Sequence, residues 1–304
     1  MGVGRLAELA PALAGPGALV LCGYPLICVW DVWGWKVLLA PSRRPAVPFG
    51  ELFLVRLAGE ALNSVTPFVD VGGEFLKVQL CVERFALTRR EALTSVVMAR
   101  TALFVSEALF WIVGLALLLP ASRVPADWSW ALIAGVGVCV ALAAILLFLQ
   151  RRGLFAAVLG WVGRFRPQAG LLERFHVSAR EADAEVARTL SARDGRFASA
   201  LGLHFVGWLA GGVETYFMFR LVGAPVTLAD GLALEAMLQL LRTVSFFIPG
   251  NLGAQEAGMA LLAQWMGFHP SLGVAVSLLK RLRQLVWTAA GFAVWGKLTV
   301  GKSG

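Results

Sequence analysis

Six long apolar stretches constrain the fold of this chain more than any other feature of its sequence. They cover residues 12–39, 92–120, 128–149, 197–222, 226–248 and 271–296. Each has about the 20 predominantly apolar residues that a helix needs to cross a bilayer. Backbone polar groups in lipid must be satisfied within the spanning segment, so such stretches favour helices. The sequence predicts an all-α polytopic membrane protein.

Composition and charge distribution agree with this class. Hydrophobic residues make up 58% of the 304 residues and charged residues only 15%, against roughly 25% charged residues in soluble domains. The net charge of +8 is concentrated in short basic blocks between apolar runs. These blocks include Arg43–Arg44, Arg89–Arg90 and Arg151–Arg152. Such blocks are typical of cytoplasmic loops, and they predict no binding of nucleic acid.

Motifs for covalent chemistry are missing from the sequence. The four cysteines lack CxxC spacing, the three histidines are scattered, and no phosphate-binding GxxxxGK[ST] loop occurs. These absences predict no metal site, no cofactor and no enzymatic activity. The N-terminus has no secretory cleavage pattern, and we expect it to be retained.

The segment 49–83 is too short to cross a bilayer twice as plain helices. Half of its 35 residues would extend about 25 Å as a helix, less than the roughly 30 Å of a hydrocarbon core. Its centre, from Asn63 to Glu74, contains Pro67, Asp70 and two glycines. We expect a re-entrant hairpin of two half-helices, with two full crossings as the alternative.

A second broken segment, 226–268, has the same character. Its centre runs from Phe247 through Pro249 to Glu256, and both of its ends lack Lys and Arg. Because basic residues favour the cytoplasmic side, we expect this hairpin to enter from the opposite face of the membrane.

The two broken segments predict an internal inverted repeat. Six residues separate Pro67 from Glu74, and six separate Pro249 from Glu256. The expected organisation is a first membrane repeat over 1–120, a connecting span with an amphipathic cytoplasmic linker over 121–196, and a second, inverted repeat over 197–304. Inverted repeats with interrupted helices indicate a transport site near the midplane.

Cations inside the predicted spans are the leading candidates for contacts with a substrate. They are Arg100, Arg242, Lys280, Arg281 and Arg283. Each costs roughly 2.5–3.5 kcal/mol to insert, and arginine binds phosphate through two parallel hydrogen bonds. A compatible alternative is structural pairing of Arg100 with Glu74, and of Arg281 or Arg283 with Glu256. We expect Arg56 and Glu60, four residues apart, to pair along one helix.

The breaks supply further candidates for substrate binding. Gly72, Gly73 and Gly253 are expected to open the second half-helix of each hairpin, where unpaired N–H groups attract anions. Asn63 and Asn251 are expected to bond backbone groups at the break or the headgroup. Glu74 and Glu256 fit two roles, stabilisation of the helix N-terminus and proton coupling.

At these residues the chain resembles a known family. RLAGEALNSVTPFVDVGGEFLK, FFIPGNLGAQEAG and LLKRLRQLVW are similar to the flippase-like family related to the transmembrane region of lysylphosphatidylglycerol synthases, especially its hopanoid-biosynthesis-associated members. The resemblance runs from about Asp31 to Trp295. It implies a multi-pass protein of the bacterial inner membrane that moves lipids between leaflets. The soluble lysyl-transferring domain of the two-part enzymes is not in this sequence, so we expect no lysyl transfer.

The residues and the resemblance together predict a flippase or transporter for an anionic, phosphate-bearing lipid. Its expected partners are membrane lipids, with lipid-biosynthesis proteins as further candidates. One alternative is a non-transporting accessory subunit of a lipid- or hopanoid-biosynthesis complex. Another is a membrane-embedded enzyme that acts on lipid-linked substrates.

Overall fold

The structure is a computed structural model, and it describes residues 21, 23–39, 46–66, 71–121, 124–154, 180–181, 183–191 and 195–300. All regular structure in these ranges is helical, which confirms the all-α class. A first helix covers 23–38 and a short one covers 183–191. The labelled helices are α2 (Phe49–Asn63), α3 (Val71–Phe85), α4 (Arg89–Ala121), α5 (Ala126–Arg152), α8 (Arg196–Leu221), α9 (Leu228–Val244), the 3-10 turn η1 (Pro249–Asn251), α10 (Ala254–Trp265) and α11 (Pro270–Val300). The predicted tip residues Pro67 and Asp70 and most of the predicted linker helix lie outside the described residues.

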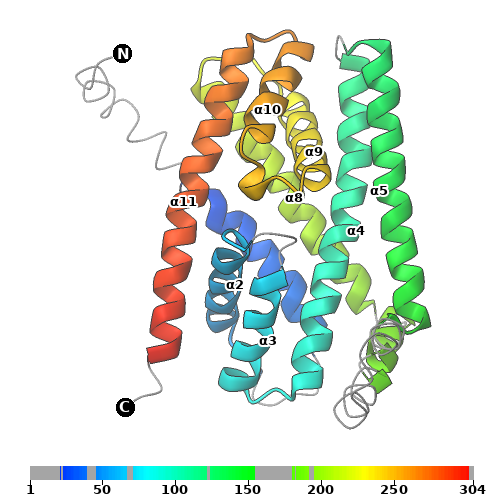
Figure 1. Cartoon of the computed structure of the whole chain (residues 1–304), viewed down its shortest axis with the longest axis vertical. Coiled ribbons are helices and arrows are strands. Elements are labelled where there is room, and N and C mark those ends of the chain that lie inside the picture. The colour runs from blue at the N-terminus through cyan, green and yellow to red at the C-terminus, as the bar shows by residue number, and fades with distance from the viewer. Residues whose placement is uncertain are drawn as a thin grey trace.

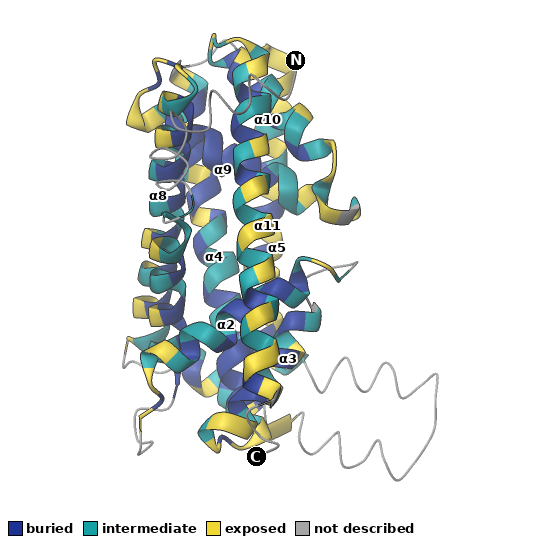
Figure 2. Ribbon diagram, turned by 90° about the vertical axis from the view of Figure 1, so that its left-hand side faces the viewer, coloured by how far each residue is buried: buried dark blue, intermediate teal, exposed yellow. Residues whose placement is uncertain are grey.

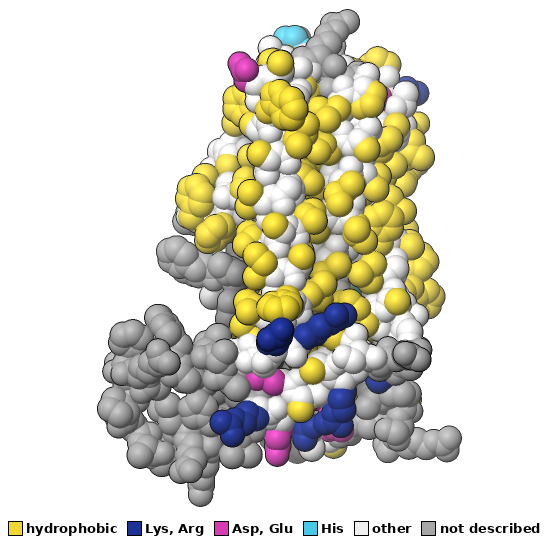
Figure 3. All heavy atoms as spheres, turned by 90° about the vertical axis from the view of Figure 1, so that its right-hand side faces the viewer, with side chains coloured by type: hydrophobic (Ala, Val, Ile, Leu, Met, Phe, Trp, Pro, Cys, Tyr) yellow, Lys and Arg dark blue, Asp and Glu magenta, His cyan; other side chains and the backbone are white. Residues whose placement is uncertain are grey.

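Two of the described helices are long and apolar enough to cross a membrane. They are Arg89–Pro120 and Ala126–Arg152. The helix α11 is 31 residues long, but it carries three adjacent or near-adjacent cations in its middle, Lys280, Arg281 and Arg283. The two apolar helices form an antiparallel pair at one side of the bundle (Figure 1). Hydrophobic side chains cover much of the face shown in Figure 3, and Lys and Arg gather near one end.

The helices α2 and α3 form the first helical hairpin. Each has 15 residues, about 22 Å of helix. Their backbones touch closely, since a Cβ on Gly73 would lie 2.0 Å from the carbonyl oxygen of Gly59. Only glycine fits at position 73. The predicted break in segment 49–83 is therefore a tight, directly packed hairpin.

The second helical hairpin is formed by α9 and α10, with 17 and 12 residues. Thr227 caps α9 by accepting a hydrogen bond from the Asp230 N–H at 3.2 Å. The chain then turns through η1, where Gly250 and Asn251 have φ of 61° and 52°. Gly253, with φ of 80°, precedes the first residue of α10, as predicted for this glycine.

The two hairpins enter the bundle from opposite ends. Figure 1 shows α2–α3 at one end and α9–α10 at the other, with the C-terminal ends of α2 and α9 directed toward the middle of the molecule. The long helix α11 packs against α2 and α10 and so contacts both hairpins. The broken-helix hairpins lie where the sequence predicts them, while the inverted repeat stays a prediction.

Two packed cores flank the middle of the bundle. One contains Trp111, Phe219 and Leu238, from α4, α8 and α9. The other contains Leu52 and Leu80, from α2 and α3, together with residues of the first helix and α4. Figure 2 shows buried residues running through the bundle, with exposed residues along α11. The polar groups between the two cores form the site.

Candidate functional site

A cavity of about 1120 Å³ lies between the two hairpins; we refer to it as the central cavity. Its wall comes from the first helix, α2, α3, α4, α5, α8, α9, α10 and α11. Its charged lining residues are Asp31, Arg56, Glu60, Glu74, Arg100, Glu107, Glu214, Glu235, Arg242, Lys280 and Arg283. Residues from distant parts of the chain therefore meet at one polar space inside an apolar bundle.

Most of the predicted site residues line this cavity. They are Asn63, Glu74, Arg100, Arg242, Asn251, Lys280 and Arg283. The other predicted residues are not part of its wall, namely Gly72, Gly73, Gly253, Glu256 and Arg281. These five lie instead at the two hairpins and on α11.

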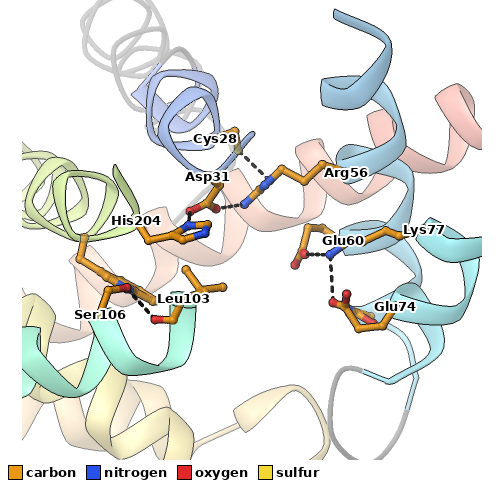
Figure 4. A network of polar contacts seen from close by, with 11 residues as sticks. Cys28, Asp31, Arg56, Glu60, Glu74, Lys77, Leu103, Ser106 and His204 are labelled. Atoms are coloured by element: carbon orange, nitrogen blue, oxygen red, sulfur yellow. Dashed lines mark hydrogen bonds and ion pairs between the residues drawn. The ribbon is translucent and has the colours of Figure 1, made fainter. Parts of the chain in front are cut away.

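Arg56 joins α2 to the first helix at the edge of the cavity (Figure 4). Its Nη2 donates to Asp31, and its Nη1 donates to Cys28 Sγ at 2.9 Å. Asp31 Oδ1 also lies 3.1 Å from Nδ1 of the buried His204 on α8. Arg56 thus pairs with a residue of another helix. The sequence had suggested a pair with Glu60 along α2 instead. The sequence reasoning missed His204, because nothing local distinguishes it from a packed histidine.

Lys77 ties the two limbs of the first hairpin together (Figure 4). Its Nζ donates to Glu60 at 2.7 Å and to Glu74 at 2.9 Å. Asn63 accepts a hydrogen bond from the Gly73 N–H at 2.6 Å, so it satisfies a backbone group at the break, one of its two expected roles. Lys77 was missed by the sequence reasoning, although its position three residues after Glu74 in an apolar helix was an available signal.

A second buried lysine, Lys280, occupies the other half of the cavity. Its Nζ lies 2.7 Å from Glu235 Oε2, and the side chains of both residues are about 95% buried, with exposures of 5% and 4%. Thr215 Oγ1 donates to Glu235 Oε2 at 2.6 Å, and Gln239 Nε2 donates to its Oε1 at 2.8 Å. A charge pair this deep requires such supporting hydrogen bonds. Close to it on α11, Arg283 Nη1 donates to Glu214 of α8.

Arg281 holds the turn of the second hairpin. It donates to Glu256, and its Nη1 and Nη2 donate to the carbonyl oxygens of Gly250 at 3.0 Å and Asn251 at 2.9 Å. Glu256 also accepts from the Gly253 N–H at 2.9 Å, which is the capping role considered for it. Of the two cations expected to pair with Glu256, the structure selects Arg281.

The cavity wall has a balanced rather than a purely cationic character. Six carboxylates and five cations line it within the described residues. Arg56, Lys280 and Arg283 each pair with a carboxylate. Carboxylates and phosphates bind the same donors. A phosphate that enters therefore competes with fixed carboxylates for these cations.

Comparison with known proteins assigns the chain to a family. The profile described as lysylphosphatidylglycerol synthase TM region matches residues 3–291. A UPF0104 membrane protein of Methanothermobacter thermautotrophicus is 26% identical over 253 residues, which cover 79% of this chain and 73% of that protein. No solved structure matches the chain. The family match confirms the resemblance drawn from the two hairpin motifs, and a membrane protein related to lipid metabolism or transport is the class it supports. The chain belongs to the family of the lysylphosphatidylglycerol synthase transmembrane region.

Proposed function

We propose that this protein moves a phosphate-bearing lipid between the leaflets of the bacterial inner membrane, without covalent chemistry of its own. The observation that carries the proposal is the central cavity, a charged space of about 1120 Å³ bordered by residues of both hairpin turns. A lipid headgroup crosses the hydrocarbon region only if polar groups replace its water. The lining residues supply such groups at the middle of the bundle.

In this proposal the headgroup phosphate is bound by arginines of the cavity wall. Arg100 on α4 and Arg242 on α9 line the cavity from two different helices. An arginine fork matches two phosphate oxygens. The fixed ion pairs around them keep the charges of the cavity paired before the lipid enters, which lowers the cost of a polar space inside the membrane.

The two hairpins are proposed to be re-entrant and to supply alternating access. Their limbs of 12 to 17 residues are shorter than the roughly 20 residues of a full span. Because the hairpins enter from opposite ends of the bundle (Figure 1), movement of one turn would expose the cavity to one leaflet only. Alternation of this kind is common in transporters built from interrupted helices.

Reconstitution tests the proposal directly. Proteoliposomes would contain a trace of phosphatidylglycerol with a fluorophore on one acyl chain, and a membrane-impermeant reductant would report the fraction in the outer leaflet over time. We expect the wild type to accelerate translocation, and Arg100→Gln and Arg242→Gln to reduce the rate at least about tenfold, or about 1.4 kcal/mol. Arg220→Gln is the matched control, since Arg220 is exposed at the end of α8.

Three outcomes separate the proposal from the alternatives. Wild-type rates in both cavity variants would overturn the assignment of the phosphate site. A folded wild-type protein that moves no lipid alone, but co-purifies with lipid-biosynthesis enzymes, would favour an accessory subunit. A new covalent product from the added lipid would favour an enzyme.

A further inference from the structure

The turns of both hairpins expose large apolar side chains beside the polar cavity. Val65, just after α2, is 57% exposed, and Phe246, just after α9, is 55% exposed. Both residues also line the central cavity. Phe247 and Leu252 of the second turn are 62% and 67% exposed. Among the described residues of the two turns, the rim therefore carries exposed apolar side chains, whereas the interior it borders is charged.

The two turns lie near each other on one side of the bundle. Figure 2 shows the described parts of both turns at mid-height on the same side. Each is bonded to α11: Ser64 Oγ lies 3.0 Å from Thr288 Oγ1, and Arg281 Nη1 donates to the Gly250 carbonyl oxygen at 3.0 Å. Arg281 and Thr288 are seven residues apart in one helix, about 10 Å along its axis. The two turns are therefore attached to α11 close together, at the middle of the molecule. We refer to the space between Val65 of one turn and Phe246 of the other as the gap.

We infer that this gap is a lateral portal that takes the acyl chains of the lipid whose headgroup occupies the central cavity. The inference rests on the proposed function and adds the place where the chains leave the protein. A lipid is the ligand that joins a charged group directly to long apolar chains, and here charged and apolar walls meet at Val65 and Phe246. Val65 and Phe246 are exposed and also line the cavity, so chains that leave the cavity beside them meet apolar side chains.

The portal also explains why the cavity need not enclose a whole lipid. Chains that pass between the turns stay in the hydrocarbon, and no apolar surface of the chains is transferred to a polar wall. The headgroup then travels inside while the chains move along the outside of the bundle. The turn residues are contact residues for the chains, distinct from the arginines that meet the phosphate.

Photo-crosslinking tests the portal independently of transport. A benzophenone amino acid would be placed at position 65 or 246, with position 285 as control, because Leu285 on α11 is 69% exposed and does not line the cavity. The protein would be reconstituted with radiolabelled phosphatidylglycerol. We expect crosslinks at all three positions, and an excess of glycerophosphoglycerol, which has no acyl chains, should reduce them at least threefold at 65 and 246 only.

Narrowing the gap provides a second measurement. Val65→Trp should slow translocation at least fivefold, whereas Leu285→Trp should keep the wild-type rate. The portal is overturned if the competitor leaves crosslinks at 65 and 246 unchanged, as at 285, and Val65→Trp translocates lipid as fast as Leu285→Trp. The transport proposal still stands in that case, provided that the wild type translocates lipid. If competition is seen but the wild type moves no lipid, the lipid site stands and transport is overturned.

Discussion

Lys77 lies between two carboxylates of the first hairpin, with its Nζ 2.7 Å from Glu60 of α2 and 2.9 Å from Glu74 of its own helix. One buried cation therefore bridges two acids on neighbouring limbs. A short hairpin inside lipid gains little from apolar burial between its limbs, because lipid is equally apolar. The three-residue cluster gives the hairpin a specific register instead.

Removal of Lys77 should destabilise the protein. Lys77→Met leaves Glu60 and Glu74 without their shared cation, and we expect the free energy of unfolding to fall by about 3 kcal/mol, at the lower end for a broken buried pair. The lower end applies because the Glu60 side chain is 28% exposed. Denaturant titration in micelles measures the effect. Lys297→Met, at an exposed position of α11, should change it by less than about 0.5 kcal/mol; equal effects would refute the structural role of Lys77.

Gly73→Ala should separate the limbs of the first hairpin. The new methyl group would meet the Gly59 carbonyl oxygen at 2.0 Å, and overpacking of this kind costs about 1–3 kcal/mol. Gly50→Ala on α2 is the control, because a Cβ there has nothing within 4 Å and should stabilise the helix slightly. Thermal unfolding in micelles should show opposite shifts for the two variants. A neutral Gly73→Ala variant would contradict the close packing of the limbs.

Arg281→Gln should loosen the second hairpin turn. The variant loses the ion pair with Glu256 and charge-assisted hydrogen bonds to two backbone carbonyls, each worth about 1.5–3 kcal/mol. Amide hydrogen exchange measured by mass spectrometry should become at least about tenfold faster over residues 249–256, while peptides of α2 and α3 keep their protection. The Arg220→Gln variant should exchange like the wild type. Unchanged protection of the turn in Arg281→Gln would count against the clamp.

Lys280 and Glu235 should show strong energetic coupling. The variants Lys280→Met and Glu235→Gln each leave the other group buried, so we expect each to cost about 3–5 kcal/mol. The double variant should cost less than the sum by more than about 1 kcal/mol. The exposed hydrogen-bonded pair Gln79–Glu83 on α3 is the reference cycle, with an expected coupling below about 0.5 kcal/mol. Additive effects at 235 and 280 would show that the pair is not formed.

The orientation of the hairpins can be measured by labelling single cysteines in a cysteine-free background. Gly50 lies at the start of α2 and Leu228 at the start of α9, and both are exposed. From the basic loops we expect Gly50→Cys to react only with a reagent added from the cytoplasmic side, and Leu228→Cys only from the outside. Reaction of both cysteines from one side would exclude entry from opposite leaflets.

Helix limits and breaks could be predicted well from the sequence, because they depend on local chemistry. The stretch 128–149 corresponds to α5, and Gly250, Asn251 and Gly253 of the second broken segment lie in its turn, while Asn63 ends α2. The pairing of Arg281 with Glu256 could also be predicted in part, since the sequence favours pairing of Glu256 with either Arg281 or Arg283.

Contacts between distant helices were harder to predict. Arg56 and Glu60 are neighbours along α2, yet each pairs with a residue of another helix, Asp31 and Lys77 respectively. Local spacing predicts only the pair along the helix, worth about 0.5 kcal/mol or less. Which residues face each other across a helix contact depends on helix rotation and depth, and a single sequence contains no direct signal for either. Asp31 and His204, 173 positions apart, meet for the same reason.

The attachment of both turns to α11 has a mechanical consequence. Thr288 is hydrogen-bonded to one turn and Arg281 to the other, and the hairpins that carry these turns point in opposite directions (Figure 1). A small slide of α11 along its own axis would push one turn back toward its end of the bundle and draw the other further in. One helix thus couples the two turns in opposite senses, so that they need no direct contact to move out of phase.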